Sequence, residues 1–153
     1  MSASHLLYYF DGKEAILEQY FEEVSIKFME YIEKLDALPI EDHIDQLADF
    51  WFLSKKSTRK EIGFMLECFG AAVNDDELKV TKADFDRRCK AHLARLFGKP
   101  ATLQVPSIHD AAELCYALMI GLRSAVYFDD DISLDDAHRL FRQSARHFCG
   151  LPT

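Results

Sequence analysis

Residues that could bind a metal ion are present in the chain, but they are scattered along it. None of the six histidines forms a His-x-x-x-His or His-Glu-x-x-His pair, which would place two ligands on one face of a helix. Helical bundles that hold metal ions through carboxylates need paired Glu-x-x-His motifs, and the nearest approach is the single Asp135-x-x-His138. The acidic run at positions 129–131 could hold a cation but is more often a hydrated turn. We therefore predict no metal site and no cofactor.

Catalytic nucleophiles in a recognisable arrangement are also missing. The sequence contains no Gly-x-Ser-x-Gly motif and no glycine-rich loop that could cradle a phosphate. The four cysteines lie inside helical windows, without a Cys-x-x-Cys pair and without a preceding secretory segment, which indicates free thiols in a reducing cytoplasm. They are Cys68, Cys89, Cys115 and Cys149. The sequence therefore predicts a cytoplasmic protein that is not an enzyme.

Aromatic and sulfur-containing side chains are concentrated in the middle of the chain. Such side chains line apolar ligand cavities with few polar anchors, and they equally fill ordinary hydrophobic cores. Gly63 and Gly70 lie among them in one helical window, where each costs about 1 kcal/mol relative to alanine. A close backbone approach or a bound ligand would compensate for that cost. We predict a pocket for a small apolar or aromatic ligand, lined by Phe28, Tyr31, Trp51, Phe52, Met65, Cys68, Phe69, Tyr116 and Met119.

The N-terminal segment from Ser2 to Phe10 has the spacing of one short helix that carries several aromatic side chains. Asp11 and Glu14 then form an Asp-x-x-Glu capping pair that begins a longer helix. A short helix with exposed hydroxyl, imidazole and aromatic groups, docked on a helix with a lysine in its first turn, suits the major groove of DNA. The candidate DNA-binding residues are Ser2, Ser4, His5, Tyr8, Tyr9 and Lys13. Alternatively, the Leu-Leu-Tyr-Tyr-Phe run belongs to a core.

Six further helices are expected from apolar spacing and capping motifs. They run from Lys13 to about Leu35, from near Ile40 to about Phe52, from Thr58 to near Asn74, from about Asp76 to Phe97, from after Ser107 to about Val126, and from after Ser133 to before Gly150. A Ser/Thr-x-x-acid capping motif opens three of them, at Thr58, Ser107 and Ser133. No convincing strand appears, so the chain is predicted to be all-α.

Composition limits what this chain can do. With 153 residues, 49% of them hydrophobic, it can build one sizeable core, so a single domain is expected. A formal net charge of −8 argues against this chain binding nucleic acid unaided, because phosphate contacts need a concentrated basic face. No apolar run looks long enough to span a bilayer, so no membrane partner is predicted.

The helix that follows Ser107 is apolar on two sides and must therefore be buried on two sides. One side is expected to face the core of its own chain. The other side carries the small residues Gly121 and Ala125 and is expected to face another subunit.

The segment from Ser2 to Leu17 resembles the recognition helix and the following helix of the TetR family of transcriptional regulators. The residues that match the family pattern are Ser2, Leu6, Tyr9, Phe10, Lys13, Glu14 and Leu17. The departures are Ser4 for a common glycine, Gly12 for a frequent serine, and Leu7 for a tyrosine that usually touches a phosphate, so Leu7 is not carried over as a contact. In that family some forty residues precede this segment, and here they would be missing.

The resemblance implies a division into residues 1–12, a remnant of a helix-turn-helix domain, and residues 13–153, a ligand-binding and dimerisation domain. The implied protein is a homodimeric, ligand-responsive repressor that binds a small effector, and that binds operator DNA only when intact. The two last helices would form a four-helix bundle with their dyad mates, through Leu118, Gly121, Leu122, Ala125, Leu134, Phe141, Ala145 and Phe148. An all-helical dimeric small-molecule-binding or interaction protein without DNA binding is the alternative. Bases upstream of the start codon that encode a basic helix would distinguish the first from the second.

Overall fold

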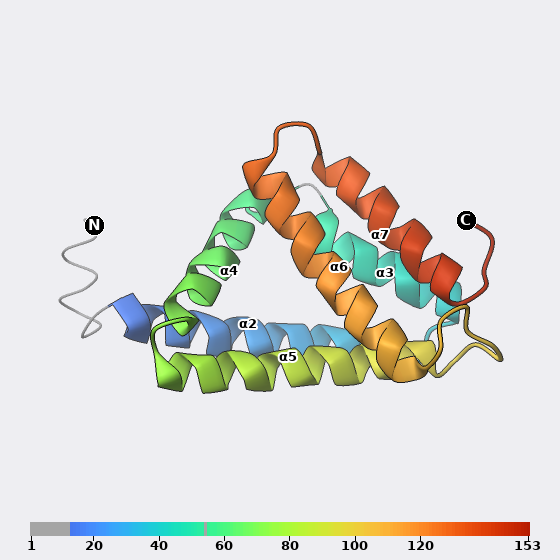
Figure 1. The fold of residues 1–153 in the computed structure, drawn as a ribbon, viewed down its shortest axis with the longest axis horizontal. Coiled ribbons are helices and arrows are strands. Elements are labelled where there is room, and N and C mark those ends of the chain that lie inside the picture. The colour runs from blue at the N-terminus through green and yellow to red at the C-terminus, as the bar shows by residue number, and fades with distance from the viewer. Residues whose placement is uncertain (1–12, 54) are drawn as a thin grey trace.

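A computed structural model describes residues 13–53 and 55–153, with side chains from Ala15 onward. This part contains six helices and no strand, which confirms the predicted all-α fold. The helices are α2 (Lys13–Leu35), α3 (Ile40–Phe52), α4 (Thr58–Ala72), α5 (Asp76–Phe97), α6 (Ile108–Phe128) and α7 (Leu134–Phe148). In Figure 1, α2 and α5 lie side by side along one edge, α6 crosses from α5 to the opposite corner, and α3 and α7 form a second pair.

The long helix α2 joins two separate groups of buried apolar residues. Its C-terminal half contributes Phe28 and Ile32 to the main core, which also includes residues of α3, α4, α5, α6 and α7. Its N-terminal half contributes Leu17 and Phe21 to a second cluster that is completed by α4 and α5. The second cluster consists of Leu17, Phe21, Cys68, Ala72 and Leu78. The N-terminal half of α2 therefore packs on α4 and α5 through this smaller cluster.

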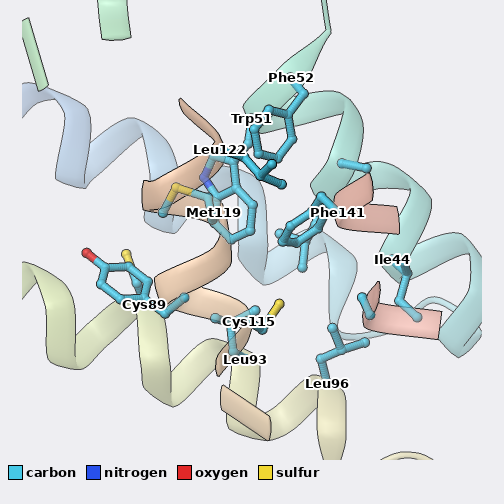
Figure 2. Packing of buried hydrophobic residues seen from close by; sticks show 14 of the residues in the cluster. Ile44, Trp51, Phe52, Cys89, Leu93, Leu96, Cys115, Met119, Leu122 and Phe141 are labelled. Carbon is cyan, nitrogen blue, oxygen red and sulfur yellow. The ribbon is translucent and has the colours of Figure 1, made fainter. Parts of the chain in front are cut away.

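Aromatic packing holds α3 against α7. The ring of Phe141 on α7 lies 5.3 Å from the ring of Trp51 and 5.4 Å from that of Phe52, both at the end of α3. Figure 2 shows these side chains pointing toward one another inside the main core. At the rim, Arg142 of α7 pairs with Asp45 of α3. The centre of the apolar stripe of α7, at Ala137, Phe141 and Ala145, is therefore covered within its own chain.

Both ends of α7 are capped at the positions that the sequence predicts. The Ser133 hydroxyl accepts a hydrogen bond from the backbone N–H of Asp136, and the Asp136 carboxylate accepts one from the backbone N–H of Ser133, which completes a capping box. At the other end, Gly150 has φ +67°, and Leu151 N–H donates to the carbonyl of Arg146 over 2.9 Å. That left-handed turn is the Schellman arrangement, which favours glycine.

The capping box predicted at Thr58 is wrong. Helix α4 begins at Thr58 itself, and Ser57 stands at the N-cap position without a side-chain hydrogen bond to the helix. Thr58 is buried, and its hydroxyl donates to the carbonyl of Leu53 over 2.9 Å. The Thr58 hydroxyl therefore binds a carbonyl at the end of α3 and does not cap the start of α4, where the sequence pattern had placed it.

Helix α6 corrects the expectation that no apolar run is long enough to span a bilayer. The helix is 21 residues long, and an 18-residue window inside it has mean hydropathy 1.3, which meets the length and composition that a membrane crossing needs. The core helix of a water-soluble protein meets the same requirement. In this structure α6 packs against α4, α5 and α7 and contributes eight buried residues. Burial inside the bundle therefore accounts for part of this apolar composition, since 39% of the apolar window is buried.

Candidate functional site

The nine predicted ligand-binding residues fall into two groups. Seven belong to the main core or pack against it, namely Phe28, Tyr31, Trp51, Phe52, Met65, Tyr116 and Met119. Cys68 and Phe69 belong to the second cluster or its edge. Within the first group the rings of Phe28 and Trp51 stack at 6.0 Å, and Trp51 and Met119, labelled in Figure 2, belong to the same core cluster. Phe28, Trp51, Phe52, Tyr116 and Met119 are buried members of the hydrophobic core.

Two hollows on the described part of the chain lie away from this aromatic set. One, of about 510 Å³, is open and runs along α2 past Glu18, Glu22 and Ile26. Another, of about 270 Å³, lies between Arg59 of α4 and the turn that joins α6 to α7. The aromatic pocket therefore stays a prediction.

Arg123 of α6 is a buried cation that the sequence analysis missed. Its side chain is 8% exposed, and its guanidinium donates to the carbonyl of Trp51 over 2.6 Å. The Nε atom of Arg123 has no hydrogen-bond partner, and no ion pair joins Arg123 to a described carboxylate. The sequence does indicate that Arg123 is unusual, because it is the single charged residue between Glu113 and Asp129 in an otherwise largely apolar helix.

Tyr20 of α2 and Glu61 of α4 interact electrostatically with Arg123. Burial and the charge of Glu61 raise the pKa of the Tyr20 phenol to about 12, while Arg123 opposes that rise. Burial lowers the pKa of Arg123, and Glu61 and Tyr20 oppose this. The ring of Tyr20 stacks on Phe64 of α4 with centroids 5.0 Å apart. Arg123 of α6 thus lies near the protonated phenol of Tyr20 on α2, and the Tyr20 ring in turn stacks on Phe64 of α4.

One of the two glycines singled out in α4 has the close approach that was expected. A Cβ added at Gly63 would lie 3.1–3.3 Å from ring atoms of Tyr127 on α6. A Cβ added at Gly70 would meet nothing within 4 Å. A close approach is thus found at Gly63, where a side chain makes it, and not at Gly70, where the alternative of a bound ligand stays a prediction.

Two predicted ligand-binding residues, Tyr116 and Phe69, contact the same ion pair on α5, which is formed by Lys82 and Asp86. The Tyr116 hydroxyl donates to Asp86, which also forms an ion pair of 2.6 Å with Lys82. The ammonium group of Lys82 lies 4.3 Å from the centre of the Phe69 ring. Burial and the hydrogen bond to Asp86 raise the pKa of Tyr116. Tyr116 is therefore a fixed hydrogen-bond donor and not a free anchor.

Two buried histidines form a chain of polar contacts where α2, α3 and α5 meet. The Nε2 atoms of His43 and His92 lie 2.9 Å apart, and the Lys99 ammonium lies 2.8 Å from Nδ1 of His43. Because Lys99 donates to that atom, His43 carries its proton on Nε2 and donates it toward His92. Nδ1 of His92 lies 3.6 Å from the Asp36 carboxylate, which can only accept a proton, and 3.4 Å from Nη2 of Arg95, which can only donate one.

Burial and the nearby cationic Lys99 lower the pKa of His43 to about 4, and burial lowers the pKa of His92 to about 4 as well. Asp36, His43 and His92 offer ligand atoms within 4.8 Å of one another, a spacing that a metal ion could use. A dication there would meet the cationic Lys99, and Arg95, whose guanidinium nitrogen lies 3.1 Å from Asp36. The donor set favours a neutral hydrogen-bonded pair, and the prediction of no metal site stays a prediction.

The eight predicted interface residues divide by burial. Leu122, Phe141 and Ala145 are buried within their own chain, and their contact with a second subunit stays a prediction. Leu118, Ala125, Leu134 and Phe148 are half-buried, and Gly121 is exposed. The sequence analysis missed Leu114 and Phe128, which are 49% and 73% exposed. With Leu118, Gly121 and Ala125 they form one apolar stripe on α6, which we call the α6 stripe.

Of the six predicted DNA-binding residues, Ser2, Ser4, His5, Tyr8 and Tyr9 lie outside the described residues. Lys13 is the first residue of α2, and its side chain is not described. The DNA-binding assignment and the division at residue 12 therefore stay predictions. All four cysteines, by contrast, are free and buried, as predicted.

Comparison with known proteins gives one finding. The family described as "BetI-type transcriptional repressor, C-terminal" matches residues 40–150. That range contains five of the six described helices, α3 to α7. No curated protein and no solved structure matches the chain.

Proposed function

Since this chain belongs to the TetR family of transcriptional regulators through a BetI-type C-terminal domain, we propose that it is the effector-binding and dimerisation part of a ligand-responsive repressor. The family match over residues 40–150 is the observation that carries this proposal. Such a protein acts in the cytoplasm without catalysing a reaction. In the intact protein, residues 1–12 would complete a helix-turn-helix head, with Ser2, Ser4, His5, Tyr8, Tyr9 and Lys13 at the DNA.

The proposed dimer uses the α6 stripe. Leu114, Leu118, Gly121, Ala125 and Phe128 follow one another at intervals of four, three, four and three residues, which is the spacing of a helix that packs along its length on another helix. Exposed apolar residues in one continuous row indicate an interaction surface. Two copies of α6 and α7 related by a dyad would bury this row in a four-helix bundle.

The proposed response to an effector passes through α2. Its C-terminal half is fixed in the main core, and its N-terminal half depends on the small second cluster with α4 and α5. A ligand that changes how α4 packs would favour one placement of that N-terminal half. In a dimer, this would change the spacing of two DNA-reading heads relative to successive major grooves.

The test is operator binding by the intact protein, measured by gel shift or fluorescence anisotropy with and without a panel of small apolar and aromatic compounds. The proposal expects a dimer that binds DNA upstream of its own gene or of a neighbouring gene. It also expects at least one compound to weaken binding. An intact dimer that binds no DNA would support the alternative of a small-molecule-binding or interaction protein. An operator affinity that no compound changes would contradict the ligand response.

A further inference from the structure

Arg123 is the strongest unused chemical feature of the described part of the chain. Of the four buried polar or charged residues there, His43, Thr58 and His92 have their buried nitrogen and oxygen atoms satisfied by hydrogen bonds. Arg123 does not, because its Nε is buried without a partner. An arginine stays protonated even when burial lowers its pKa, so a positive charge is held inside the protein.

The hydrogen bond of Arg123 to Trp51 does not balance this charge. A carbonyl oxygen at the end of α3 accepts from one Nη atom over 2.6 Å and carries only part of a negative charge. Glu61, the acidic residue that acts on Arg123, is exposed on α4 and makes no ion pair with it. A buried charge without an ionic partner costs far more than a buried apolar group of the same size. Some compensating anion is therefore expected.

The groups around Arg123 indicate what that anion looks like. The Nε atom and the neighbouring Nη form the edge of a guanidinium that binds a carboxylate through two parallel hydrogen bonds. Tyr20, protonated at all ordinary pH values, supplies a further possible donor from α2. The stacked rings of Tyr20 and Phe64, with Trp51 at the carbonyl contact, supply apolar surface for the rest of the molecule. An inorganic anion has no apolar part that could pack on these rings.

We infer that the effector of this regulator is a small apolar or aromatic carboxylic acid whose carboxylate binds the Nε edge of Arg123 between α2, α4 and α6. This inference rests on the proposed function and specifies the chemistry of its effector. It also gives the effector contact with α2 and α4, which together with α5 build the second cluster.

The experiment compares carboxylates with their uncharged amides on the full chain at neutral pH. Octanoate and benzoate are each tested against octanamide and benzamide by isothermal titration calorimetry and by thermal shift. The expected result is that at least one carboxylate binds about tenfold or more tightly than its amide, because a charge-assisted hydrogen bond is lost in the amide. Equal binding of both partners in each pair, or binding by neither carboxylate, would overturn the inference.

Variants then locate the site. Arg123→Met keeps an unbranched, flexible side chain but removes the guanidinium and its charge, and it should abolish the preference for carboxylate. The matched control is Arg59→Met, because the exposed Arg59 also donates to a backbone carbonyl, that of Tyr127, over 2.9 Å. Carboxylate preference that survives in Arg123→Met, or that is lost equally in Arg59→Met, would overturn the inference. If Arg123→Met fails to fold, the comparison of carboxylate with amide on the unmodified chain still decides.

The outcomes separate this inference from the proposed function. Neutral compounds that bind and change operator affinity, while carboxylates do not bind, would refute the Arg123 site and leave the regulator intact. A carboxylate that binds through Arg123 in an intact protein whose operator affinity does not change would support the site and contradict the ligand response.

Discussion

Gly63 and Gly70 occupy the same helix in different surroundings, so one substitution should affect them differently. Alanine at Gly70 meets nothing within 4 Å and should stabilise the protein by up to about 1 kcal/mol through helix propensity. Alanine at Gly63 gains the same propensity, but its Cβ would press on the Tyr127 ring at 3.1 Å. We expect Gly70→Ala to raise the melting temperature and Gly63→Ala to leave it at or below that of the unmodified protein. Equal stabilisation by Gly63→Ala and Gly70→Ala would show that the Tyr127 ring can move aside without a cost in free energy.

The His43–His92 pair predicts a loss of stability in mild acid. Both imidazoles have a pKa of about 4 in the folded protein and an ordinary value of 6.5, so the unfolded chain binds more protons between these values. The free energy of unfolding should therefore fall as pH drops from 6.5 toward 4, by roughly 1–2 kcal/mol per imidazole between pH 7.5 and 5. The charged groups that act on the two imidazoles determine the pH at which half of this stability is lost. They are Asp36, Arg95 and Lys99.

Urea denaturation at several pH values would measure this slope. His92→Gln removes one buried imidazole and should give a shallower slope, even where its stability at pH 7.5 is lower. The control His109→Gln changes an exposed histidine at the start of α6 and should keep the slope of the unmodified protein. A His92→Gln slope equal to the original would mean that the buried pair does not carry the pH dependence.

At the scale of helices, the two serines at positions 57 and 133 test what a cap contributes. Ser133 accepts from the backbone N–H of Asp136 and belongs to a complete capping box, whereas the Ser57 side chain caps nothing. Ser133→Ala should therefore cost about 1 kcal/mol of unfolding free energy, and Ser57→Ala should be close to neutral. Chemical denaturation of both variants would check this, and equal losses would contradict the assigned N-cap geometry.

The helix bounds could be predicted because the signals that set them are local. Apolar spacing placed α2 and α5, and the serine motifs placed the starts of α6 and α7. Thr58 shows where such signals fail, since its hydroxyl is taken by Leu53 of the preceding element. A capping pattern does not reveal a competing acceptor that only the tertiary fold brings near.

The candidate site was harder to predict, because its groups come from distant parts of the chain. His43 and His92 are 49 residues apart, and Arg123 bonds a carbonyl 72 residues away. The apolar pattern of α7 likewise could not show whether α3 or a second subunit covers it. In the structure, Phe141 of α7 packs on Trp51 and Phe52 of α3. What the pattern of α6 did indicate was a second apolar side, around Gly121 and Ala125.

For the whole molecule, that second side leads to a prediction about assembly. Gly121 is exposed on the α6 stripe, and an added Cβ there meets nothing within 4 Å, so one chain accommodates a larger residue. Across a dyad, however, an arginine at this position would be a bulky, unpaired charge between packed helices. Gly121→Arg should therefore weaken dimerisation about a hundredfold or more while leaving the fold of each chain intact.

Light scattering coupled to size-exclusion chromatography, over a range of protein concentrations, would measure this change. The matched control is Gly70→Arg, which places the same residue at an exposed glycine on α4 with equally open surroundings. The unmodified protein and Gly70→Arg should elute as dimers, and Gly121→Arg as a monomer with an unchanged helical circular dichroism spectrum. A dimer that survives Gly121→Arg would place the interface elsewhere. An unmodified protein that is a monomer at all concentrations would remove the basis for a dyad-related pair of DNA-reading heads.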